Sequence, residues 1–133
     1  MTNKSKKILT EISPGELLDK ISILEIKLLK INNKERILQI NKEYESLIET
    51  RNSNINFDKD LKILFIQLKE INLKLWDIEN NKRICEKNKD FGKKFIDLAR
   101  NVYLNNDKRA KIKSEINRIL DSNFKEIKQY SDY

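Results

Sequence analysis

Histidine is absent from this 133-residue sequence, and cysteine occurs only once, as Cys85. Without histidine the chain can form neither a histidine-ligated zinc site nor a catalytic triad that uses histidine as its base. One cysteine excludes an internal disulfide framework, and we predict that Cys85 is a buried, unreactive thiol. We therefore expect no resident metal cofactor. A carboxylate-bound Mg²⁺ stays open because it needs only oxygen ligands.

Glycine and proline are also scarce, with two and one in the whole chain. A β-rich protein needs turn residues every few positions, so this scarcity predicts an all-α fold of a few long helices. The longest uninterrupted apolar run is Ile63-Leu64-Phe65-Ile66, far too short to cross a membrane. No apolar signal-type stretch follows the basic start of the chain, so we expect a cytoplasmic protein.

Charged residues are plentiful, with 28 basic and 21 acidic residues and a formal net charge of +7, and 22 of the basic residues are lysine. A basic surface attracts anionic partners. The sequence shows no basic stripe interleaved with aromatic residues and no recognition-helix signature, so we do not expect nucleic-acid binding. Lysines that solvate helix surfaces explain the excess charge.

Helix-start signals divide the chain into segments. Residues 1–12 are predicted to be a polar tail, and Ser13-Pro14-Gly15-Glu16 has the pattern of a capping box with proline in the first turn. We expect one helical domain over residues 13–121, followed by a C-terminal turn or tail over 122–133.

The apolar spacing predicts a first helix from Pro14 to about Arg51, continuous through Asn32-Asn33, with two apolar faces in its first half. After a turn at 52–56, Asp58 is predicted to cap a second helix that ends near Asn88. A short turn would make these two helices a long antiparallel hairpin, which is typical of coiled-coil packing.

Phe91-Gly92 marks a break, and the rest of the chain is predicted to form two shorter helices, 93–104 and 108–121, packed at one end of the hairpin. One continuous helix stays open, because neither glycine nor proline separates them. The other end, about 34–65, would project as a two-helix arm with Ile37, Ile40, Tyr44 and Leu47 as its contact face.

Polar residues from four stretches should meet where the shorter helices dock. Arginine is rare in this lysine-rich chain, so we expect it where planar, bidentate pairing with a carboxylate or phosphate is needed. The ligand-binding candidates are Glu16, Asp19, Lys20, Trp76, Asp77, Glu79, Arg83, Arg100, Tyr103, Asn106 and Arg109. A structural salt-bridge network among these charges is the alternative that we place first, because such networks outnumber active sites. Trp76 and Tyr103 are expected mainly as core anchors.

Several of these stretches, in this order, resemble an uncharacterised family of short bacterial and phage proteins, a domain of unknown function. The resemblance covers about residues 12–120. Its pieces are Ile12 through Leu24, Leu75-Trp76-Asp77-Ile78-Glu79, Phe91-Gly92 through Arg100-Asn101-Val102-Tyr103, and Asn106-Asp107-Lys108-Arg109-Ala110 to Ile116-Asn117. Some members of this family accompany glycosyltransferase genes, so the resemblance implies an accessory role in surface-glycan or nucleotide-sugar metabolism.

Two functions therefore compete. The leading hypothesis is an interaction module that binds a protein partner or a second copy of itself through the arm. The alternative is a protein or enzyme that binds a small anion, such as a phosphate, nucleotide or nucleotide sugar, through the arginine, lysine and carboxylate cluster. The residues do not decide whether the chain is an enzyme.

Overall fold

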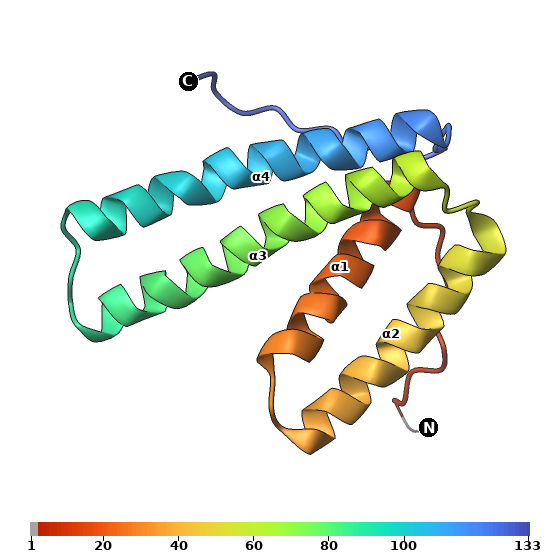
Figure 1. The fold of residues 1–133 in the computed structure, drawn as a ribbon, viewed down its shortest axis with the longest axis horizontal. Helices are drawn as coiled ribbons and strands as arrows, with labels where there is room; N and C mark the ends of the chain where they lie inside the picture. The colour runs from red at the N-terminus through yellow and green to blue at the C-terminus, as the bar shows by residue number, and fades with distance from the viewer. Residues whose placement is uncertain (1–2) are drawn as a thin grey trace.

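Four helices make up the fold in the computed structural model, which describes residues 3–133 (Figure 1). They are α1 (Pro14–Lys30), α2 (Lys34–Asn54), α3 (Lys59–Lys87) and α4 (Lys93–Ile119). No strand occurs among the described residues, so the all-α prediction is confirmed. Met1 and Thr2, at the start of the predicted polar tail, lie outside the described part.

The helices form two hairpins rather than one (Figure 1). The long antiparallel pair is α3 with α4, and α1 packs against all three other helices. The predicted pairing of the 34–54 segment with the start of α3 is wrong, because α2 packs along α1 instead. The chain reverses between α1 and α2, which sends α2 back beside α1 and brings the start of α3 close to the start of α1.

This reversal corrects the prediction of one helix from residue 14 to 51. Ile31 adopts an extended conformation, and the side chain of Asn33 accepts a hydrogen bond from the backbone N–H of Arg36 at 3.1 Å. Asparagine is a favoured N-cap because its short side chain satisfies a free N–H of the first turn. The cap makes a new helix start possible, and the packing of α2 on α1 stabilises it.

In the C-terminal half the two predicted shorter helices form a single helix, α4, which is the alternative that the sequence left open. The helix continues through residues 105–107, between the two predicted segments. Asn105 donates from its side chain to the backbone carbonyl of Asn101 at 2.8 Å, one turn earlier in the same helix. Its amide is thereby satisfied without ending the helix.

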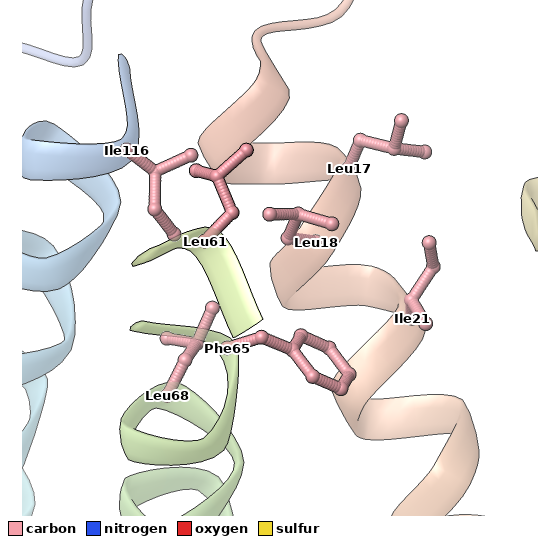
Figure 2. Close-up of a cluster of buried hydrophobic side chains, with 7 residues drawn as sticks. All are labelled: Leu17, Leu18, Ile21, Leu61, Phe65, Leu68 and Ile116. Carbon is pink, nitrogen blue, oxygen red and sulfur yellow. The ribbon is translucent and has the colours of Figure 1, made fainter. Parts of the chain in front are cut away.

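The hydrophobic core lies where the starts of α1 and α3 meet the end of α4. Figure 2 shows Phe65 pointing from α3 toward α1, and Leu61 beside Ile116 of α4. Each fully buried aliphatic side chain here contributes about 2 kcal/mol. The core cluster consists of Leu17, Leu18, Ile21, Leu61, Phe65, Leu68 and Ile116.

The predicted contact face of the arm is turned inward. Ile37, Ile40, Tyr44 and Leu47 are all partly buried, and Tyr44 and Leu47 pack against the core cluster. The 34–65 region is therefore not a projecting two-helix arm. Its apolar stripe is the surface that holds α2 on α1.

Candidate functional site

A buried carboxylate joins three of the helices. The side chain of Asp19 in α1 is 1% exposed, and its Oδ1 accepts hydrogen bonds from Arg109 Nε of α4 and from Asn72 Nδ2 of α3, both at 2.9 Å. A second guanidinium N–H of Arg109 bonds to Oδ2. The pairing is bidentate, as a guanidinium and a carboxylate favour. It is the inter-helix ion pair that the sequence offered as its structural alternative.

Asn72 of α3 also joins Ser22 of α1 to this network. Its Nδ2 also donates to Ser22 Oγ at 2.7 Å, and the Ser22 hydroxyl donates to the backbone carbonyl of Asp19 at 2.7 Å. Both side chains are buried. Asn72 is a polar residue within the apolar stripe of α3, and this is the sequence signal that could have identified it as a buried network residue.

Lys113 of α4 is a second cation close to the same carboxylate. Its side chain is 10% exposed, and its Nζ lies 2.7 Å from Glu16 Oε2 and 3.8 Å from Asp19 Oδ2. Burial alone would lower the pKa of Lys113, but Glu16, Asp19 and Glu126 together raise it above its usual value. The hydrogen bond to Asp19 likewise raises the pKa of Arg109. Both cations therefore stay charged at neutral pH.

The start of α1 is pressed directly against α4. The backbone N–H of Gly15 donates to Asn117 Oδ1 at 2.7 Å, and a Cβ added at Gly15 would lie 2.6 Å from the backbone carbonyl oxygen of Lys113. Only glycine permits this approach. The Ser13 cap is as predicted, with Ser13 Oγ accepting from the Glu16 N–H at 3.2 Å, while the Glu16 carboxylate binds Lys113.

The members of this network satisfy one another's hydrogen bonds within the protein. Among the described residues, no buried side-chain nitrogen or oxygen lacks a hydrogen-bond partner. Removing one member of such a network is costly because the others stay buried. Gly15, Glu16 and Asp19, all at the start of α1, therefore each make a contact that joins α1 to α4.

A cleft of about 510 Å³ lies beside this network, between α1 and α3. Its volume is within the range of small-molecule sites. One part of its lining is apolar and includes the only tryptophan of the chain, whereas the other part is polar and includes two arginines. The lining residues are Ile23, Ile26, Asn72, Leu75, Trp76, Glu79, Asn80, Arg83 and Arg109.

Arg83 and Glu79 form the polar edge of the cleft. The guanidinium of Arg83 lies 3.2 Å from Glu79 Oε2, and Lys82 Nζ lies 3.1 Å from Oε1. The hydrogen bond from Lys82, assisted by Arg83, lowers the pKa of Glu79, so this carboxyl group is ionised at neutral pH. The Arg83 side chain is 76% exposed. Such an exposed pair is weak, so Arg83 can turn toward a ligand at little cost.

Arg109 connects the network to the cleft. Two of its N–H groups point to Asp19, and the side chain also lines the cleft. A guanidinium carries five N–H donors, so three remain for other partners. Its position is fixed by the buried carboxylate, which makes it a preorganised cation.

The predicted candidates therefore separate into groups. Glu16, Asp19 and Arg109 meet in the buried network, and Trp76, Glu79, Arg83 and Arg109 line the cleft. The remaining candidates lie outside both: Lys20 and Arg100 are exposed, Asp77 lies 3.8 Å from Lys30, Tyr103 packs its ring against Tyr133, and Asn106 lines a separate pocket beside α4.

Sequence analysis missed several residues of both features. Ser22, Asn72, Lys113 and Asn117 complete the network, and Ile23, Ile26, Leu75 and Asn80 complete the cleft lining. A lysine among many lysines carries no distinguishing signal, so Lys113 could not be recognised. Ile23 and Ile26 carry no signal in the sequence beyond their place in the apolar spacing of the first predicted helix.

Two further observations concern the described residues 3–133. No three or more of the carboxylate and thiol side chains gather closely enough to hold a metal ion. No helix among these residues combines the length and the apolar character that crossing a membrane requires.

The chain matches the model of a known protein family. A model described as "Family of unknown function (DUF6165)" matches residues 8–132, which is nearly the whole chain. The chain belongs to this family. The match includes all four helices, the buried network and the cleft. No curated protein and no solved structure matches the chain.

Proposed function

We propose that the chain binds a small anionic molecule in the cleft between α1 and α3. The observation that carries the proposal is the pairing of Arg83 and Arg109 with an apolar wall that includes Trp76. Binding sites for small molecules combine a mostly apolar lining with a few fixed polar groups. Here Arg109 is held in place by Asp19, and Arg83 is exposed and adjustable.

The apolar part of the cleft lining disfavours a bare inorganic ion as the ligand. Ile23, Ile26, Leu75 and Trp76 offer no hydrogen bonds to a phosphate, apart from the indole N–H. They favour a ligand that also carries an apolar or planar part. The glycosyltransferase association implied by the resemblance adds nucleotide sugars to nucleotides, phosphates and small carboxylates as ligands to test.

Trp76 supplies the measurement, because it is the only tryptophan in the chain and lies in the cleft lining. The ligand panel is titrated against tryptophan fluorescence, with and without Mg²⁺. We expect a selective, saturable change. A ligand present at a hundred times its dissociation constant also stabilises the fold by about 2.7 kcal/mol, which raises the melting temperature by several degrees.

Arg83→Ala tests the role of the cleft, and Arg118→Ala is its matched control. Both arginines are exposed and pair with a glutamate one turn away, but Arg118 lies on α4 and does not line the cleft. Loss of a charge-assisted hydrogen bond should weaken binding about tenfold or more in Arg83→Ala. Unchanged affinity in Arg83→Ala, equal losses in both variants, or no ligand response in the panel would refute the proposal.

An interaction module is the second candidate. Its original basis, the apolar stripe of α2, is half-buried on α1. Two large apolar side chains near the α1–α2 turn are nevertheless exposed, Leu29 at 67% and Leu38 at 69%. Sedimentation at high protein concentration tests the homodimer form of this function, and a strictly monomeric chain would count against it.

A further inference from the structure

Asn72 presents a hydrogen-bond acceptor to the cleft between α1 and α3. The residue is only 5% exposed, and its amide nitrogen donates twice, to Asp19 Oδ1 at 2.9 Å and to Ser22 Oγ at 2.7 Å. Nothing among residues 3–133 donates to its carbonyl oxygen. Because no fully buried side-chain oxygen in this range lacks a partner, the carbonyl oxygen reaches solvent, and Asn72 lines the cleft.

The orientation of this amide is fixed by Asp19. If the amide were turned over, its carbonyl oxygen would face the buried carboxylate, and two acceptors would oppose each other. Arg109 is held beside it, because its Nε bonds to the same carboxylate oxygen at 2.9 Å. The two donor nitrogens therefore lie within about 6 Å of each other. The inner end of the cleft thus combines a fixed acceptor from Asn72 with the free N–H donors of Arg109.

The surplus positive charge lies at the other end of the cleft. Asp19 already balances the charge of Arg109, so the inner end offers hydrogen bonds without an excess of charge. At the outer end, Lys82 and Arg83 share the single carboxylate of Glu79. One positive charge is left over there, so an anionic group is favoured at the outer end.

Trp76 lies between the two ends. Asn72, Trp76 and Arg83 are four and then seven positions apart, which places them on one face of α3. The Arg83 guanidinium lies 3.2 Å from Glu79 Oε2 and 3.5 Å from the Glu79 backbone carbonyl, so it is level with Glu79. That level is about 10 Å along the helix from Asn72. The order along the cleft is a donor–acceptor pair, an indole ring and a cation.

We propose that the cleft binds a nucleotide, with its base against Asn72 and Arg109 and its phosphate at Arg83. This inference rests on the proposed function and adds the class of the ligand and its direction in the cleft. Every nucleobase carries an N–H donor beside an acceptor on its Watson–Crick edge, which complements the carbonyl oxygen of Asn72 and the N–H groups of Arg109. Its planar face stacks on Trp76, as bases do on aromatic side chains.

Calorimetry on the whole chain tests the base end. The four nucleoside 5′-monophosphates are compared with ribose 5-phosphate, which has the same sugar and phosphate but no base. We expect at least one nucleotide to bind tenfold or more tightly than ribose 5-phosphate, because stacking and the two edge hydrogen bonds act only on the base. The analogue of that nucleotide with its Watson–Crick N–H groups methylated should bind at least fivefold more weakly. This comparison probes Asn72 without altering the buried network.

Arg83→Ala tests the phosphate end, with Arg118→Ala as its control. Arg83→Ala should weaken the nucleotide about tenfold and leave the affinity of the corresponding nucleoside, which has no phosphate, unchanged. Arg118→Ala should change neither affinity, since Arg118 does not line the cleft.

The outcomes separate this inference from the proposed function. The inference is overturned if ribose 5-phosphate binds as tightly as every nucleotide, if the methylated base binds like its parent, or if Arg83→Ala weakens nucleoside and nucleotide equally. Each of these results still leaves a ligand site in the cleft. Absence of binding by every anion tested would refute the proposed function itself, and this inference with it.

Discussion

Asp19 and Arg109 are 90 positions apart in the chain, yet a bidentate ion pair joins them across the α1–α4 contact. The carboxylate is almost completely buried, and the guanidinium is only partly exposed. Arg109 pairs with Asp19 inside the helix junction, and its side chain also lines the cleft. The same residue therefore links the stability of the helix junction to the geometry of the candidate site.

Asp19→Asn should destabilise the fold strongly. The substitution keeps the shape of the side chain but removes its charge and places an N–H₂ group among the donors of Arg109 and Asn72. Breaking a buried ion pair from one side costs about 3 kcal/mol or more. Urea unfolding should show this as a lower midpoint with an unchanged slope.

Glu115→Gln is the matched control for this experiment, because Glu115 and Arg118 form an exposed pair within α4. We expect no measurable change in its unfolding midpoint. Equal midpoints for Asp19→Asn and the parent protein would show that the buried pair does not stabilise the junction of α1, α3 and α4.

Local signals in the sequence predicted where α1, α3 and α4 start, but not where α2 starts. Ser13 and Asp58 cap α1 and α3 as expected, since each places a side-chain oxygen on a backbone N–H three residues ahead. Arg109 was selected because arginine is rare in this chain, and it does make a bidentate pair. These features depend on residues close in sequence or on the chemistry of one side chain.

Features that depend on distant residues could not be predicted. The apolar spacing continues across Asn32-Asn33, so periodicity alone favoured an unbroken helix. The break between α1 and α2 is stabilised by the packing of α2 on α1. No local sequence pattern indicates that packing. Gly15 is required by the backbone of α4 about a hundred positions away, and Glu126 reaches Lys113 only because the chain turns back after α4.

Asn33→Ala tests the cap that starts α2. Its side chain accepts from the Arg36 N–H at 3.1 Å, and loss of an asparagine N-cap costs about 1 kcal/mol. Asn32→Ala is the matched control, because Asn32 is the exposed neighbour and does not cap the helix. Thermal unfolding should show a lower melting temperature for Asn33→Ala alone; similar shifts in the two variants would contradict this role.

Tyr44 gives the chain a stability that is lost at high pH. Its hydroxyl donates to Glu25 Oε2 at 3.1 Å, and Glu25 Oε1 accepts from Lys69 at 2.9 Å, so the three side chains join α2, α1 and α3. Burial raises the pKa of Tyr44 above its ordinary value of 10.0, and the charge and hydrogen bond of Glu25 raise it further. The folded protein therefore holds the phenolic proton more tightly than the unfolded chain does.

The sign of the effect follows from that difference. A group whose pKa is raised by folding contributes its full stability below its unfolded pKa of about 10 and loses it as the pH rises through the folded pKa. Tyr44→Phe should be less stable than the parent by about 1 kcal/mol at pH 8, through the lost hydrogen bond. That difference should shrink above pH 10, because the parent then loses the contribution that the variant never had. Urea midpoints measured from pH 8 to 11 test this, with the exposed Tyr130→Phe as control, and a difference that stays constant with pH would refute it.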